Sequence, residues 1–216
     1  NPKFILNSTL VAENFYLNEE YEKAQKILKN FDKKYEFYYW FRVKKEAQII
    51  IKDKGYDEGI NYLSLKFSKI KNPNVKMVFD IANFYKNSKN YEKAIEYYTE
   101  IISSLDDNSE IKSDLLYRRG GSYERLGNFQ RADGDLKYSL RINPDDAYVL
   151  NYLAYSWLER DYKIDEAMRM LEKAYALRSN DPYITDSIGW AYYLIENYTE
   201  AEKYIKKAVE LMPDDP

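Results

Sequence analysis

The sequence of 216 residues contains no cysteine and no histidine. Disulfide bonds, thiol nucleophiles, cysteine–histidine zinc sites and catalytic triads that use imidazole are therefore excluded. Chemistry would have to rest on carboxylates, lysine, serine or tyrosine, and no constellation of these residues stands out. We therefore expect no catalytic site, no cofactor and no metal site. A chain without cysteine suits both the cytoplasm and the periplasm, so the compartment stays open.

Long apolar runs and a strong excess of one charge are also missing. No run approaches the roughly 18 apolar residues that a membrane-spanning helix needs, so we expect no membrane span. The formal net charge of −3 argues against general binding to nucleic acid or to anionic membranes. The charge is uneven, because residues 1–112 hold 19 basic and 17 acidic residues while residues 113–216 hold 14 and 19. The C-terminal half is therefore the acidic one.

One pattern of small and large apolar residues returns six times along the chain, about every 35 residues. Position 8 of the pattern is small: Ala12, Ala47, Ala82, Gly120, Ala154 and Gly189. Position 20 is also small: Ala24, Gly59, Ala94, Ala132, Ala167 and Ala201. Position 24 is large: Leu28, Leu63, Tyr98, Leu136, Leu171 and Ile205. Small residues at this spacing let two antiparallel helices approach closely, and the large residue fills the space beside their contact.

Two further features support a helical hairpin in each repeat. Position 17 is aromatic in five repeats, and we expect these rings to fill the same wedge as position 24. They are Tyr21, Tyr56, Tyr91, Phe129 and Tyr198. Asn90, Asn128 and Asn197 precede the second helix of their repeats. An asparagine there caps free backbone N–H groups at the start of a helix.

This unit resembles the tetratricopeptide repeat (TPR), a helix–turn–helix of about 34 residues with small residues at positions 8 and 20 and a proline at 32. The resemblance is strongest over residues 122–146 and 188–215. It implies an all-α fold, a right-handed superhelical α-solenoid of about six TPR repeats. We expect one array over residues 1–216, a fragment of a longer protein. The predicted repeats are about 5–39, 40–74, 75–112, 113–146, 147–181 and 182–216.

In the family that the chain resembles, ligands contact positions 2, 5, 9, 12 and 13 of each first helix, on a concave face. Transferred to this sequence, these positions give a groove that is basic and polar toward the N-terminus and aromatic toward the C-terminus. We expect it to bind a protein or peptide segment with apolar side chains. The predicted site consists of Phe79, Asn83, Tyr117, Tyr148, Asn151, Tyr155, Tyr183, Asp186, Trp190 and Tyr193. The competing interpretation is that these rings only pack between repeats.

The function that the resemblance implies is a non-enzymatic scaffold or adaptor for protein partners. Residues 145–216 resemble repeats of proteobacterial TPR proteins, some of them envelope lipoprotein adaptors, which suggests the envelope or periplasm while the cytoplasm stays open. The apolar edge of the last helix, residues 201–212, suggests self-association. The alternative is a substrate-selecting arm of an enzyme whose catalytic domain lies outside this chain.

Two other classes of ligand are disfavoured. A clamp for the C-terminal carboxylate of chaperones would need a lysine where Phe79 stands, although Asn83 matches one clamp position. RNA binding by the related pentatricopeptide repeat is disfavoured because the C-terminal half has no basic groove.

Overall fold

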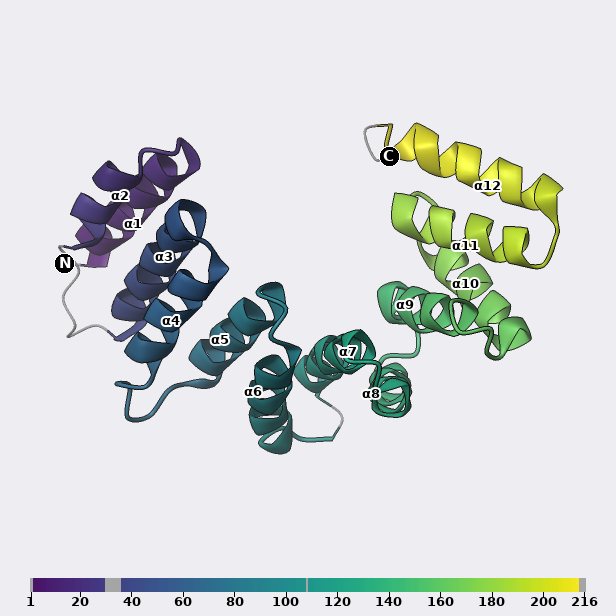
Figure 1. Ribbon diagram of the computed structural model, residues 1–216, viewed down its shortest axis with the longest axis horizontal. Coiled ribbons are helices and arrows are strands. Elements are labelled where there is room, and N and C mark those ends of the chain that lie inside the picture. Colours follow the sequence, from purple (N-terminus) through teal and green to yellow (C-terminus); the bar gives the residue numbers. More distant parts are fainter. Residues whose placement is uncertain (1, 30–35, 108, 214–216) are drawn as a thin grey trace. The chain divides into compact units, whose positions relative to one another are not determined.

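The computed structural model describes residues 2–29, 36–107 and 109–213, over which the chain forms twelve α-helices and no strand (Figure 1). This confirms the all-α prediction. Consecutive helices pair into hairpins. The first helices are α1 (Pro2–Leu17), α3 (Glu36–Lys54), α5 (Val75–Asn87), α7 (Glu110–Arg125), α9 (Ala147–Leu158) and α11 (Pro182–Leu194). The second helices are α2 (Tyr21–Leu28), α4 (Tyr56–Phe67), α6 (Tyr91–Ser103), α8 (Phe129–Ile142), α10 (Ile164–Leu177) and α12 (Tyr198–Leu211).

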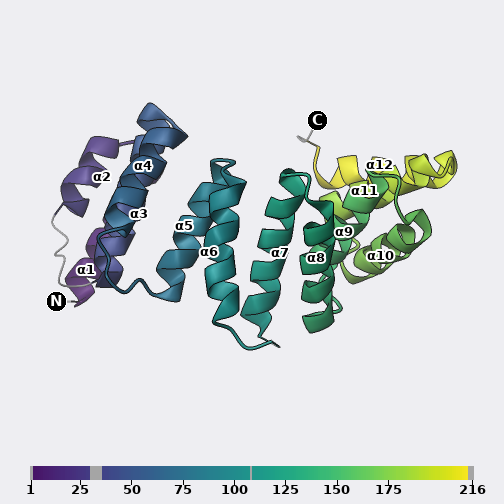
Figure 2. The same ribbon diagram turned by 60° about the horizontal axis from the view of Figure 1, so that its bottom comes forward.

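The chain divides into two compact units, Asn1–Tyr97 and Tyr98–Pro216, and the division falls within α6. Within each unit the two helices of a hairpin lie side by side, as α3 and α4 do in the first unit and α7 and α8 in the second (Figure 2). None of the helices in the described ranges is both long and apolar enough to cross a lipid bilayer. The single array over all 216 residues, whose two ends lie outside the described residues, stays a prediction.

The small residues of the repeat pattern form the contact between the two helices of each hairpin. All twelve residues at positions 8 and 20 are buried, and so is position 24 in the first five repeats. The exception is Ile205, which is 37% exposed in the last hairpin. Val209 and Leu211 are exposed on the same helix, α12. The self-association predicted from this edge stays a prediction.

Glycine marks the places where the helices approach most closely. A Cβ atom on Gly59 of α4 would lie 2.9 Å from the carbonyl oxygen of Ala47 in α3 and would overlap the side chain of Ile51. Position 20 of the second helix therefore lies directly against position 8 of the first, as the repeat pattern predicts. By contrast, a Cβ on Gly134, which lies within α8, would meet no atom within 4 Å.

The prediction for position 17 is wrong in three of the five repeats, whereas Tyr21 packs against the buried cluster that contains Ala12, Ala24 and Leu28. Tyr56 is 47% exposed, Phe129 38% and Tyr198 59%. Each is the first residue of its helix, so its ring lies at the turn of the hairpin and not along the helix contact.

The predicted asparagine caps are present. The side-chain oxygens of Asn90, Asn128 and Asn197 accept hydrogen bonds from backbone N–H groups three residues later. Helices α3 and α7 begin at Glu36 and Glu110, earlier than the predicted repeat starts at residues 40 and 113. Neither predicted start has a proline before it to end the preceding loop.

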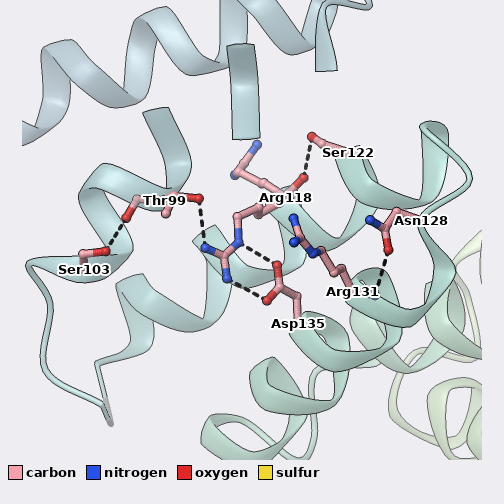
Figure 3. A network of polar contacts seen from close by, with 8 residues as sticks. Thr99, Ser103, Arg118, Ser122, Asn128, Arg131 and Asp135 are labelled. Carbon is pink, nitrogen blue, oxygen red and sulfur yellow. Dashed lines mark hydrogen bonds and ion pairs between the residues drawn. The ribbon is translucent and has the colours of Figure 1, made fainter. Parts of the chain in front are cut away.

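In the second unit, an ion pair joins α7 to α8 and reaches back to α6 (Figure 3). The guanidinium of Arg119 donates two hydrogen bonds to Asp135, at 2.7 and 2.8 Å, and a third to the hydroxyl of Thr99 at 3.0 Å. Burial lowers the pKa of Arg119, but the bonds to Asp135 outweigh it and leave the pKa raised. Both side chains are more than four-fifths buried, so each charge depends on the other.

We expect Gly59→Ala to destabilise the first unit by about 1–2 kcal/mol. Overpacking costs about 1–3 kcal/mol, which exceeds the gain of about 1 kcal/mol from replacing a helical glycine. The matched control is Gly134→Ala, which keeps the gain without the clash and should stabilise by about 0.5–1 kcal/mol. Urea unfolding followed by circular dichroism measures both changes. Equal stabilisation by the two substitutions would contradict the close approach at Gly59.

We expect Asp135→Asn to destabilise the second unit by about 2–4 kcal/mol, because it leaves the Arg119 charge buried without a carboxylate. The control is Asp114→Asn, which removes the partner of Arg118 in a pair that is one-third to one-half exposed. An exposed pair contributes about 1 kcal/mol or less, so this change should be small. Thermal unfolding of both variants tests the difference, and similar losses would refute the assignment.

Candidate functional site

The first unit contains a groove of about 630 Å³ that crosses the first helices of three successive hairpins. Its walls come from α1, α3 and α5, with Tyr56 at the start of α4. From α3 the groove is lined by Phe41, Lys44, Lys45, Gln48, Ile51 and Lys52. These residues include all five positions of the second repeat at which the family resemblance places ligand contacts. From α5 it is lined by Asp80, Asn83, Phe84 and Asn87.

The carboxylates of the groove are paired with lysines from neighbouring hairpins. Lys44 of α3 lies 2.8 Å from Asp80 of α5, and the same carboxylate accepts a hydrogen bond from the Trp40 indole at 2.9 Å. Lys45 lies 2.5 Å from a carboxylate oxygen of Glu13 on α1. These contacts hold α3 to the helices on both sides of it. They also leave little uncompensated negative charge on the groove wall.

One polar atom of the groove lacks a partner. The side-chain oxygen of Gln48 is buried and has no hydrogen-bond partner among the described residues. Leaving such an acceptor without a donor costs about 1–3 kcal/mol. Gln48 lines the groove beside the half-buried rings of Phe41 and Phe84. The wall of the groove therefore combines apolar surface with a covered acceptor that lacks an N–H or O–H donor.

The predicted residues of the first unit have different environments. Asn83 lines the groove, whereas Phe79 is half-buried on α5 and does not line it. The sequence analysis missed Lys45 and Asp80, which occupy position 6 of their repeats, next to the predicted position 5. Both residues are charged and stand at the same position of successive repeats, and this pattern could have indicated that they line the groove.

In the second unit, the predicted tyrosines of α9 and α11 are largely exposed. Their exposed fractions are 44% for Tyr148, 39% for Tyr155, 58% for Tyr183 and 49% for Tyr193. Tyr148 lies against the guanidinium of Arg178, at 4.9 Å from the ring centre. These rings are therefore partly exposed on the surface of the second unit.

Trp190 connects the two helices. Its indole donates a hydrogen bond to Glu159 at the C-terminal end of α9, at 3.2 Å, and its ring stacks on Tyr193 at 5.3 Å. Burial and the nearby charge of Glu159 raise the pKa of the Tyr155 phenol, so its hydroxyl stays protonated. The structure thus brings Tyr155 and Trp190 near one carboxylate, with Tyr193 against the Trp190 ring.

The remaining predicted residues are less exposed or lie at the edge of this surface. Tyr117 of α7 is half-buried, with its ring edge-to-face on Tyr152 at 5.6 Å. The side-chain oxygen of Asn151 is buried without a hydrogen-bond partner among the described residues. Asp186 is exposed on α11. The sequence analysis omitted Glu159 from the site, although it stands at position 13 of its repeat.

Two segments of the chain match family models described as tetratricopeptide repeat, residues 75–104 and 186–215. These segments coincide with the hairpins α5–α6 and α11–α12. Among curated proteins, a TPR repeat-containing protein of Pseudomonas aeruginosa is 26% identical over 170 residues, which are 79% of this chain and 28% of that protein. A homologue of lipoprotein NlpI from Haemophilus influenzae is 30% identical over 109 residues, 50% of this chain and 34% of that protein. The chain therefore spans about a third or less of these relatives.

Solved structures share the fold at low sequence identity. Pseudomonas aeruginosa pilF matches 99% of this chain and 94% of its own, with a TM-score of 0.69 and 13% identity. YrrB, described as a TPR protein with an unusual peptide-binding site, matches 80% of this chain and 86% of its own, with a TM-score of 0.54 and 16% identity. At these identities the likeness concerns the fold alone. The chain therefore contains tetratricopeptide repeats and has the all-α helical-hairpin fold of tetratricopeptide-repeat proteins.

Proposed function

We propose that this chain is a non-enzymatic protein-binding module that holds an extended peptide segment in the groove across α1, α3 and α5. Proteins with TPR repeats typically mediate protein–protein interactions. The observation that carries the proposal is the buried, unpartnered oxygen of Gln48 in the wall of that groove. A peptide main chain supplies an N–H donor at every residue except proline, so it is suited to satisfy this acceptor once the Gln48 amide turns toward the groove.

The size and lining of the groove support a peptide ligand. A volume of about 630 Å³ lies within the range of about 300–1,000 Å³ that is usual for ligand sites. Phe41, Ile51 and Phe84 offer apolar surface for side chains of the ligand, while Asn87 adds an amide at the rim. Since Glu13 and Asp80 already have lysine partners, contacts to the main chain and apolar contacts would dominate recognition.

An adaptor role follows from the same proposal. The groove is built by three successive hairpins, so a ligand that lies along it would contact each of them. An adaptor would bring such a bound segment to another component. The alternative of an enzyme's substrate-selecting arm, whose catalytic domain would lie outside this chain, has no specific observation in its favour.

We expect Gln48→Leu to weaken peptide binding about tenfold without loss of stability. The change removes the acceptor of a hydrogen bond from the peptide. A tenfold increase in Kd corresponds to a loss of about 1.4 kcal/mol of binding free energy, which is in the range expected for one hydrogen bond. It also removes a buried polar group that has no partner in the free chain, so the free energy of unfolding should stay equal or rise. The probe is the best binder selected from a random extended-peptide library on the whole chain, with Kd measured by fluorescence anisotropy.

The matched control for this substitution is Gln130→Leu, at an exposed glutamine of α8 in the second unit. It should leave the Kd unchanged. If Gln48→Leu binds the selected peptides as tightly as the unchanged chain does, the groove is not their site and the proposal fails. A large loss of stability in Gln48→Leu would show that the oxygen has a structural partner and would also count against it.

A further inference from the structure

A second surface, separate from the groove, lies on α9 and α11 of the second unit. We define it as the α9–α11 patch, formed by Tyr155 and Glu159 of α9 and by Asp186, Trp190 and Tyr193 of α11. The two helices contact each other directly. Every member except Trp190, which is half-buried, is exposed.

The carboxylate of Glu159 is held in place by the indole of Trp190, which donates a hydrogen bond to it at 3.2 Å. Tyr155 stands four residues before Glu159, on the same helix face. Trp190 is itself fixed by stacking on Tyr193, with ring planes 17° apart. A side chain that is anchored by a fixed neighbour loses less conformational entropy when a ligand binds than a free glutamate would.

The charge of this carboxylate is not compensated within the protein. In the parts of the chain that the structure describes, Glu159 forms no ion pair with a lysine or arginine. The groove of the first unit differs, because Glu13 and Asp80 each have a lysine partner there. The second carboxylate of the patch, Asp186, raises the pKa of the Tyr155 phenol by its charge, so it acts on the same surface.

The aromatic rings favour the same kind of ligand as the carboxylates. The faces of tryptophan and tyrosine carry negative electrostatic potential and attract cations, by about 0.5–1 kcal/mol at exposed sites. An apolar side chain would also contact these rings, but it would bury the Glu159 carboxylate without a partner, which is costly. A cationic side chain is attracted by both the aromatic rings and the carboxylate, so the patch favours it over an apolar side chain.

We propose that the α9–α11 patch binds an arginine or lysine side chain of a basic protein segment. Arginine suits it best, because its planar guanidinium stacks on an aromatic ring while donating hydrogen bonds to a carboxylate. This inference concerns a different surface from the groove and does not depend on peptide binding there.

The test uses the whole chain and three short labelled glycine–serine peptides that carry arginine, leucine or glutamate at the same alternating positions. Because an apolar peptide can also bind the groove of the first unit, the affinities are compared through the emission of Trp190, and we expect the arginine peptide to act at a concentration at least about fivefold lower than either of the others. Glu159→Gln should weaken binding of the arginine peptide about three- to tenfold. The matched control is Glu210→Gln on α12, which changes the net charge equally at an exposed residue outside the patch and should have little effect.

Tryptophan fluorescence locates the binding. Trp40 and Trp157 are buried, at 3% and 0% exposure, so a surface ligand on the second unit should change mainly the emission of Trp190. The arginine peptide should alter this emission, and Trp190→Phe should abolish the change. Tighter binding of the leucine peptide in the Trp190 signal would overturn the proposal in favour of an apolar ligand. If Glu159→Gln and Glu210→Gln weaken binding of the arginine peptide equally, the binding is nonspecific attraction by an acidic surface and the proposal fails.

Discussion

The contact between positions 8 and 20 of each hairpin is the constraint on which the rest of the structure depends. Every repeat has glycine or alanine at both positions, and at Gly59 even a Cβ atom would lie 2.9 Å from the Ala47 carbonyl oxygen. This contact fixes the rotation of each first helix about its axis. Position 9 follows position 8 by one residue, which turns its side chain by about 100° away from the contact. The groove residue Gln48 and the patch residues Tyr155 and Trp190 all stand at position 9.

The features of the fold that could be predicted from sequence are those set by short spacings. Burial at positions 8, 20 and 24 and the asparagine caps depend on residues within one hairpin, and they are found as predicted. The failures have a different cause. Tyr56 and Phe129 are exposed because each begins a helix, and a helix boundary depends on the preceding turn more than on the period of the repeat. Ile205 is exposed because no further described hairpin covers α12.

The positions of the candidate surface residues could be predicted from the sequence, but the polar contacts between them could not. Positions 2, 5, 9, 12 and 13 of the second repeat do line the groove, and the predicted tyrosines of α9 and α11 are exposed. What the spacing could not show is which charges meet. Lys44 of the second hairpin pairs with Asp80 of the third, and the Trp190 indole donates a hydrogen bond to Glu159, which lies 31 residues earlier in the sequence. Such contacts depend on the stagger between hairpins, which no local pattern encodes.

The same positions therefore produce two surfaces with different chemistry. In the groove, lysines of α3 neutralise the carboxylates of its neighbours, so hydrogen bonds and apolar contact remain to recognise a ligand. In the α9–α11 patch, the Trp190 indole holds a carboxylate that forms no ion pair among the described residues. Packing constrains only the residues between the helices, so adjacent positions can vary without cost to the fold. On the two proposals, the chain would hold two segments of different chemistry, one in each unit, because neither surface uses residues of the other.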